Sequence, residues 1–462
     1  MKKKVEKFPL WGQLLYSSGY VGITIVDRIW VVFLIYFFLP PVESGMPLLL
    51  SDKTFLGIFT VLGLITIFGR IIDSIADPLV ATWTDRSKSK LGRRRVFLLY
   101  GGLPLMACAV LLFFPPSNEP GIANTIYVAG MLGLLLFFFT FYVVPWLALI
   151  PELSHTDRER MNIVTMQAVF SLLGVVIVMI GGFMMWGAFE SGGMDKATAL
   201  RTTIIVLAVI GLISCYITII PINEKRYCDS VPSEVGIIDS LKMTFKNTPF
   251  IPYLFGTICL WFAFNMVSSA ATYYVTVLLQ KGEEFGSVVF GAVFGVALVL
   301  FPIINFASRY IEKRVIMIFG LVVFAIASFL IYYLGTDVLP FSPIVQAFIL
   351  FGLIGVPASA LFVVPNAMIS DLAEYDAIKT GTKREGMYFG AQGLVQKINL
   401  GISSAILVYL LSAYGKDIAN PLGVKLSGPV AAAVCVIGII MFAIYPEKKI
   451  FKLVEENRAK EK

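Results

Sequence analysis

Long apolar runs separated by short polar segments dominate the chain. A helix needs about 20 mainly apolar residues to cross the hydrocarbon core of a bilayer, and the runs predict twelve such helices. Several runs exceed 25 residues, which indicates tilted helices or helix ends that emerge from the bilayer. The predicted ranges are 12–39, 55–81, 96–114, 122–150, 163–187, 202–222, 249–280, 286–308, 314–334, 341–370, 387–414 and 426–446.

Composition supports a membrane protein and argues against other classes. Of the 462 residues, 58% are hydrophobic and 15% are charged, whereas a soluble domain usually carries about 25% charged residues. The single histidine, His155, has no Cys or His neighbour, and the five cysteines are scattered without metal-ligand spacing. A nucleophile–base pair and a cofactor fingerprint are also missing, so we expect no enzyme and no cofactor.

The lysines and arginines predict the orientation of the helices. With both termini in the cytoplasm, 28 of the 37 basic residues fall in cytoplasmic segments and six in outer loops. This asymmetry follows the positive-inside rule. The net charge of +7 is dispersed over these segments, so we expect contact with membrane lipid and no nucleic acid.

The longest cytoplasmic connection divides the chain into two six-helix halves. Secondary transporters commonly have two such halves, with a substrate site between them near the middle of the membrane. The apolar run after the basic N-terminus is too long for a signal peptide, so we expect a retained first helix. The predicted parts are an N-terminal half (1–222), a middle loop (223–248), a C-terminal half (249–446) and a cytoplasmic tail (447–462).

Three charged residues lie within the second predicted helix. Arg70, Asp73 and Asp77 stand at positions i, i+3 and i+7, a spacing that places them on one helix face. Two carboxylates this close do not both stay ionised in a low dielectric without a compensating positive charge. A monovalent cation or a proton would provide that charge, and the oxygen ligands suit a hard cation such as sodium. The alternative is a static salt-bridge ladder that braces helix packing.

Lys397 lies in the eleventh predicted helix, with long apolar runs on both sides. Its ammonium group cannot easily reach either membrane surface, so a buried carboxylate partner is expected. The available acids are Asp27, Asp73 and Asp77. We predict that Lys397 links the C-terminal half to acids of the N-terminal half. The alternative is a lysine that only reaches a water-filled cavity.

Two further charged segments offer candidate contacts. Asp27 and Arg28 are neighbours in the first helix, point about 100° apart, and are therefore not expected to form one simple pair. Asp27 is a candidate substrate or coupling acid, with a structural role as the alternative.

The loop TDRSKSKLGRRR after the second predicted helix is rich in basic residues, and three roles are open for it. It could bind lipid headgroups. It could brace helix ends and gate the cytoplasmic side through carboxylates such as Asp85 and Glu152. It could also be a basic loop exposed to solvent, without a further role.

At this point the chain resembles a known family. RIIDSIADP followed by DRSKSKLGRRR is similar to the signature of the glycoside–pentoside–hexuronide:cation symporters, the melibiose-permease-like branch of the major facilitator superfamily. A second motif, SDLAEYDAIKTGTKREGMYFGAQGLVQKINLG, and the segment TFYVVPWLALIPELSHTDRER also resemble that family. The similarity covers nearly the whole chain, and the two long motifs together are specific.

The resemblance implies a major facilitator fold and cation-coupled transport. It implies coupling to sodium, lithium or protons through Asp73 and Asp77, with Thr140 as a hydroxyl neighbour. It also implies that Lys397 lies near the ion and sugar sites. Arg70 joins this charge network, and no other metal site is expected.

The resemblance further implies that Gln392 and Trp146 line the substrate cavity, but other positions depart from the pattern. Sugar-carrying members usually grip hydroxyl groups with an acid in helix 1, an acid in helix 4 and an arginine in helix 5. This chain has Thr24, Val143 and Gln167 there. Unmet hydroxyl groups are costly when buried, so the substrate is expected to differ from a galactoside.

Two residues bear on the substrate and the coupling ion. Asp27 lies one turn from Thr24 and is the candidate replacement for the first acid. Ala76 occupies the position where some relatives have an amide, which favours proton coupling.

We therefore expect a monomeric secondary active transporter, integral to the inner membrane, that carries a small-molecule sugar or glycoside together with a cation or proton. Opposing buried charges in two halves favour rocking over a fixed channel pore. The alternative cargo is a lysophospholipid or another amphipathic molecule.

Overall fold

The computed structural model describes residues 6–54, 60–154, 157–228, 245–308, 310–361, 364–380 and 385–461, and the regular elements in these ranges are helices. Ten of the described helices are long and apolar enough to cross a membrane. The chain is therefore an all-helical, multi-pass membrane protein. It divides into two compact units, Met1–Ser233 with Gly282–Ser287, and Glu234–Lys281 with Val288–Lys462.

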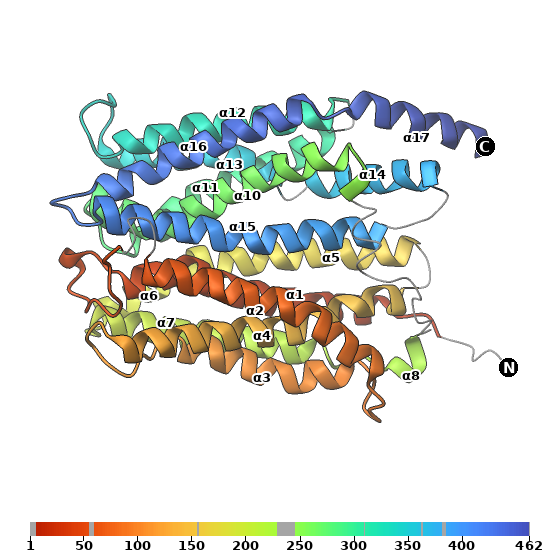
Figure 1. Ribbon diagram of the computed structural model, residues 1–462, viewed down its shortest axis with the longest axis horizontal. Helices are drawn as coiled ribbons and strands as arrows, with labels where there is room; N and C mark the ends of the chain where they lie inside the picture. Colours follow the sequence, from red (N-terminus) through yellow and green to blue (C-terminus); the bar gives the residue numbers. More distant parts are fainter. Residues whose placement is uncertain are drawn as a thin grey trace. The chain divides into compact units, whose positions relative to one another are not determined.

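The first unit is a bundle in which α1 packs against α5 and α7, α2 against α4, and α3 against α4 and α7. These helices run alongside one another in Figure 1, from red to yellow-green. Its elements are α1 (Leu10–Phe38), η1 (Val42–Ser44), α2 (Val61–Arg86), α3 (Arg95–Leu111), α4 (Ile122–Leu153), α5 (Asp157–Val176), the π-helical turn η2 (Ile177–Gly182), α6 (Phe183–Ser191), α7 (Lys196–Ile217) and α8 (Glu224–Tyr227).

Small residues allow these helices to approach closely. A Cβ added to Gly22 of α1 would lie 2.5 Å from the carbonyl oxygen of Gly211 in α7. Between α2 and α4, a Cβ added to Gly133 would lie 2.7 Å from Ile72 Cδ1. Both contacts follow the pattern of membrane bundles, in which packing replaces the hydrophobic effect and small residues lie at the interfaces.

The second unit repeats four of these helix pairings. The helix α10 packs against α15 and α16, and α12 packs against α13 and α16. The elements, green to blue in Figure 1, are α10 (Phe250–Tyr273), the π-helical turn η3 (Tyr274–Leu278), α11 (Phe285–Ala307), α12 (Lys313–Leu330), η4 (Ile331–Tyr333), α13 (Pro343–Leu361), α14 (Val364–Thr380), α15 (Glu385–Tyr414), α16 (Leu422–Ala443) and α17 (Glu447–Glu461).

A glutamate caps the start of α3 in the first unit. Glu224 begins α8, directly after the unit's last long helix. Its carboxylate accepts hydrogen bonds from the backbone N–H groups of Arg93, Arg94 and Arg95 at 2.7, 2.9 and 2.6 Å. Such N–H groups have no partner within their own helix, and the positive end of the helix dipole favours a negative charge there.

The second unit contains the equivalent contact. Glu447 begins α17, directly after α16, and its carboxylate accepts from the backbone N–H groups of Lys313 and Arg314, both at 2.7 Å. Burial raises the pKa of the Glu447 carboxyl, while the two N–H donors act in the opposite direction. The two units thus share a capping device as well as several helix pairings, which supports an internal structural repeat.

Removal of either cap is expected to destabilise its unit. In Glu224→Ala and Glu447→Ala, the helix N-terminus loses charge-assisted acceptors, which costs about 1–3 kcal/mol. Thermal unfolding of the purified protein should show a lower midpoint for both variants. The exposed Glu119→Ala is the matched control. Unchanged unfolding midpoints in both cap variants would show that the two glutamate caps do not stabilise their units.

Candidate functional site

The predicted cluster on α2 meets a hydroxyl group from α4. Arg70 and Asp73 are buried, with 6% and 0% of their surface exposed, and Arg70 Nη1 donates to Asp73 Oδ2 at 3.0 Å. Thr140 Oγ1 lies 2.5 Å from Asp73 Oδ1 and 3.4 Å from Asp77 Oδ1. The structure therefore brings together both carboxylates and the hydroxyl of Thr140.

The chemistry of this cluster suits a small hard cation. Two carboxylates and one hydroxyl group offer oxygen ligands, which sodium, lithium and related ions prefer. Arg70 bonds Asp73 directly, and Asp77 is only half-buried. Two acids this close favour a positive charge between them, which a cation or a proton can supply.

The prediction for Asp27 and Arg28 is wrong. Arg28 Nε donates to Asp27 Oδ2 at 2.9 Å, and Arg28 Nη2 bonds the same oxygen. The two Cβ atoms diverge on the helix, but the long arginine stem folds back and brings the guanidinium to the neighbouring carboxylate. Arg28 is 7% exposed, and the Asp27 side chain is 26% exposed.

Two predicted substrate residues lie where α1 and α5 pack together. Thr24 Oγ1 of α1 donates to Ser171 Oγ of α5 at 3.3 Å. Gln167, one turn before Ser171, is 4% exposed, and its Nε2 has no hydrogen-bond acceptor among the described residues. A buried amide donor of this kind needs an acceptor, so Gln167 stays a candidate for substrate contact.

Trp146 is enclosed by protein in this structure. It is fully buried, its Nε1 donates to Thr218 Oγ1 at 3.1 Å, and its ring stacks on Tyr16 at a centroid distance of 5.1 Å. These contacts join α4 to α1 and α7. A role for Trp146 in substrate binding stays a prediction.

The remaining predicted residues belong to the second unit. Gln392 Oε1 accepts from the hydroxyl of Tyr253 at 2.7 Å, and the same hydroxyl lies 2.9 Å from the carbonyl oxygen of Pro365. Lys397 lies on α15, about one turn beyond Gln392, and is half-buried. Its predicted link to the acids of the first unit stays a prediction.

The basic loop after α2 braces the end of α4, as its charge pattern predicts. Arg93 Nη2 and Arg94 Nη2 lie 2.6 and 2.8 Å from Glu152 Oε1. This part of the prediction is confirmed. The side chain of Asp85, the second predicted partner, lies outside the described residues.

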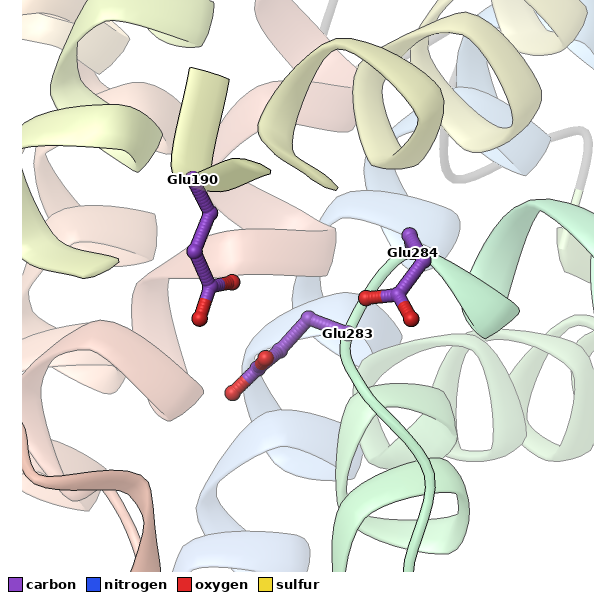
Figure 2. Close-up of side chains that lie close together, drawn as sticks. All are labelled: Glu190, Glu283 and Glu284. Atoms are coloured by element: carbon purple, nitrogen blue, oxygen red, sulfur yellow. The ribbon is translucent and has the colours of Figure 1, made fainter. Parts of the chain in front are cut away.

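Sequence reasoning missed one cluster of acids in the first unit. Carboxylate oxygens of Glu190, Glu283 and Glu284 lie within 4.8 Å of one another, and Figure 2 shows these side chains. Lys196 Nζ lies 3.0 Å from Glu283 Oε1 and 3.9 Å from Glu190 Oε1, and the Tyr36 hydroxyl donates to Glu283 at 3.0 Å. The adjacent pair of glutamates before α11 was visible in the sequence, but its approach to the end of α6 was not.

Comparisons with known proteins agree with this fold. The family model for MFS/sugar transport proteins matches residues 11–445. The chain is 23% identical to the isoprimeverose transporter of Lactiplantibacillus pentosus, over 77% of this chain and 73% of that protein. It is 21% identical to a putative sulfoquinovose importer of Escherichia coli, over 88% of this chain and 83% of that protein.

A solved structure shows the same fold. The bacterial homologue of the human lysosomal transporter Spinster superimposes with a TM-score of 0.65 and 13% identity, over 94% of this chain and 95% of that one. Together these findings define a transporter of the major facilitator superfamily. Within it, the chain belongs to the MFS/sugar transport protein family, the glycoside–cation symporter branch that its motifs resemble.

Loss of the Thr140 hydroxyl is expected to weaken ion binding at the α2 cluster. Thr140→Val removes a hydrogen-bond partner of ionised oxygens, an interaction whose loss corresponds to about 10- to 100-fold in affinity. Thr140→Ser keeps the hydroxyl and is the control. Ions that bind the folded state raise its melting temperature, so a sodium, lithium or pH titration of melting temperature measures the change. Equal ion responses in both variants would exclude Thr140 from the site.

Proposed function

We propose that this protein is a cation-coupled symporter that carries a sugar or glycoside across a bacterial inner membrane by alternating access. The observation that carries the proposal is the convergence of Asp73, Asp77 and Thr140 oxygens from two helices. The family of the chain and its sugar-transporting relatives support the cargo class. A sugar is favoured over the lysophospholipid alternative because the relatives reported above are named for sugars.

The coupling mechanism follows from the cost of buried charge. Without a cation, two acids one turn apart repel each other in a medium of low dielectric constant. A bound cation removes this repulsion, stabilises the cluster and raises the affinity for cargo nearby. Thermodynamic linkage makes the effect reciprocal, so the cargo must tighten ion binding by the same factor. Both then leave together after the two halves rock.

The identity of the coupling ion depends on the ligands around Asp77. Ala76 offers no oxygen beside it, which leaves the carboxylates and the Thr140 hydroxyl as the side-chain ligands named here. Fewer oxygens favour a proton over sodium, because sodium needs several ligands while a proton needs one basic oxygen. We therefore place proton coupling ahead of sodium or lithium coupling.

We further propose twelve membrane crossings with both termini in the cytoplasm. Two helices would add to the ten apolar ones: α2, which carries the charged cluster, and α3, which has 17 residues. Reporter fusions after residues 118, 194 and 337 should report the outer side, and fusions after residues 90, 225 and 462 the cytoplasmic side. A cytoplasmic signal at residue 118 would remove α3 from the set of crossings.

The decisive test replaces each acid in turn. Asp73→Asn and Asp77→Asn remove the charge that a cation balances, so uphill accumulation in proteoliposomes should fall at least about tenfold, while the protein still inserts and folds. Exposed Asp337→Asn is the matched control. Counterflow without an ion gradient separates a coupling defect from loss of cargo binding. Full accumulation by either variant would refute the proposed coupling site.

A further inference from the structure

The segment Gly282–Ser287 belongs to the first unit, although the chain on both sides of it belongs to the second. It packs against α6 at two glycines. A Cβ added to Gly187 of α6 would lie 2.3 Å from Glu284 Cβ, and a Cβ added to Gly286 would lie 2.6 Å from Phe183 Cδ1. Because neither glycine has a side chain, the two backbones approach closely, and two glutamates of the segment come next to the end of α6.

Three carboxylates meet at this contact. Oxygens of Glu190, Glu283 and Glu284 lie within 4.8 Å of one another. In Figure 2 the carboxylates of Glu190 and Glu284 are turned toward that of Glu283. Glu190 lies in the last turn of α6, where the negative end of the helix dipole disfavours an acid and favours a cation. The cluster is therefore costly unless positive charge lies among its oxygens.

One positive charge is already present, but it reaches only part of the cluster. Lys196 Nζ lies 3.0 Å from Glu283 Oε1 and 3.9 Å from Glu190 Oε1. The Tyr36 hydroxyl donates to the same oxygen of Glu283. No ion pair joins Glu284 to a basic side chain in the part of the chain that the structure describes. The lysine therefore leaves oxygens of this cluster for a second cation.

The other oxygen of Glu283 points to a ligand. The Glu283 side chain is 1% exposed, and its Oε2 has no hydrogen-bond partner among the described residues. A carboxylate oxygen that is buried without a donor costs free energy. A cation among the three carboxylates removes this cost, because it coordinates the oxygen that Lys196 and Tyr36 leave unmatched.

The ligand set suits a divalent cation of the calcium type. Calcium binds carboxylate oxygens at about 2.3–2.6 Å, in a flexible geometry that waters complete. Two oxygens on opposite sides of such an ion lie about 4.6–5.2 Å apart, so oxygens within 4.8 Å of one another can share one ion. Glu284 is exposed, which gives the ion and its waters access. Magnesium demands a tighter octahedral shell, and zinc is usually bound by cysteine or histidine.

We propose that Glu190, Glu283 and Glu284 bind one divalent cation of the calcium type, with Glu283 Oε2 as the buried ligand. The ion ties the segment Gly282–Ser287 to the end of α6. Lys196 competes with the ion, because its ammonium group lies at oxygens of the same carboxylates. The site uses none of the residues of the α2 cluster. Its placement on the outer side of the membrane rests on the proposed topology, whereas the binding itself does not.

The test measures calcium binding to the purified protein. Titration with CaCl₂ at constant ionic strength, followed by calorimetry and by thermal shift, should show saturable binding of one ion per chain. The expected midpoint is about 0.1–1 mM, the range of calcium modules that work outside cells. MgCl₂ should bind at least about tenfold more weakly. Absence of saturable calcium binding would rule out the site, and equal affinity for magnesium would overturn the assignment to calcium.

Single amide substitutions locate the ion. Glu190→Gln and Glu284→Gln each remove one charged ligand, so each should weaken calcium binding at least about tenfold. Exposed Glu119→Gln is the matched control and should bind calcium as the wild type does. Because Glu284 is exposed, its variant is expected to fold even where Glu283→Gln does not. Wild-type calcium affinity in both Glu190→Gln and Glu284→Gln would place the ion elsewhere and overturn the proposal.

Two further variants separate the site from its alternatives. Lys196→Met removes the competing ammonium group and should raise calcium affinity at least about threefold. A lower affinity in this variant would contradict competition at these oxygens. Asp73→Asn should keep calcium binding, and a loss there would assign the ion to the α2 cluster instead. Full accumulation by Asp73→Asn with intact calcium binding would refute only the proposed coupling site, so the two failures are distinguishable.

Discussion

A fully buried carboxylate in a membrane protein must have its charge balanced, and Asp73 shows how this protein does it. Its two oxygens are engaged by different partners, Arg70 on one side and Thr140 on the other. The first contact comes from its own helix and the second from α4. The contact with Thr140 therefore links the packing of α4 to the charged residues of α2.

The two units resemble each other in architecture. The pairs of α1 with α5 and α7 recur as α10 with α15 and α16, and each unit uses a glutamate after its last apolar helix to cap α3 or α12. Capping fixes the helix ends inside a unit through backbone groups.

The charged residues of the first unit differ in how completely their polar groups are paired. Arg28 forms an ion pair with Asp27. Near the end of α4, Glu152 forms ion pairs with Arg93 and Arg94. Arg70 is different because part of its guanidinium meets no acceptor among the described residues. Buried polar groups are usually paired in native proteins. This exception sets Arg70 apart from the other arginines discussed for the first unit.

The sequence by itself determined the all-helical membrane class, the charged face of α2 and the family, because apolar length, helical spacing and motif order are local properties of the chain. Tertiary structure alone decided three other matters. It brought the guanidinium of Arg28 into contact with Asp27, because the flexible arginine side chain can fold back although the two Cβ atoms point in different directions. It brought Glu190 to Glu283, which lie far apart in the chain. It also left one edge of Arg70 without an acceptor, because hydrogen-bond satisfaction depends on every neighbouring element at once.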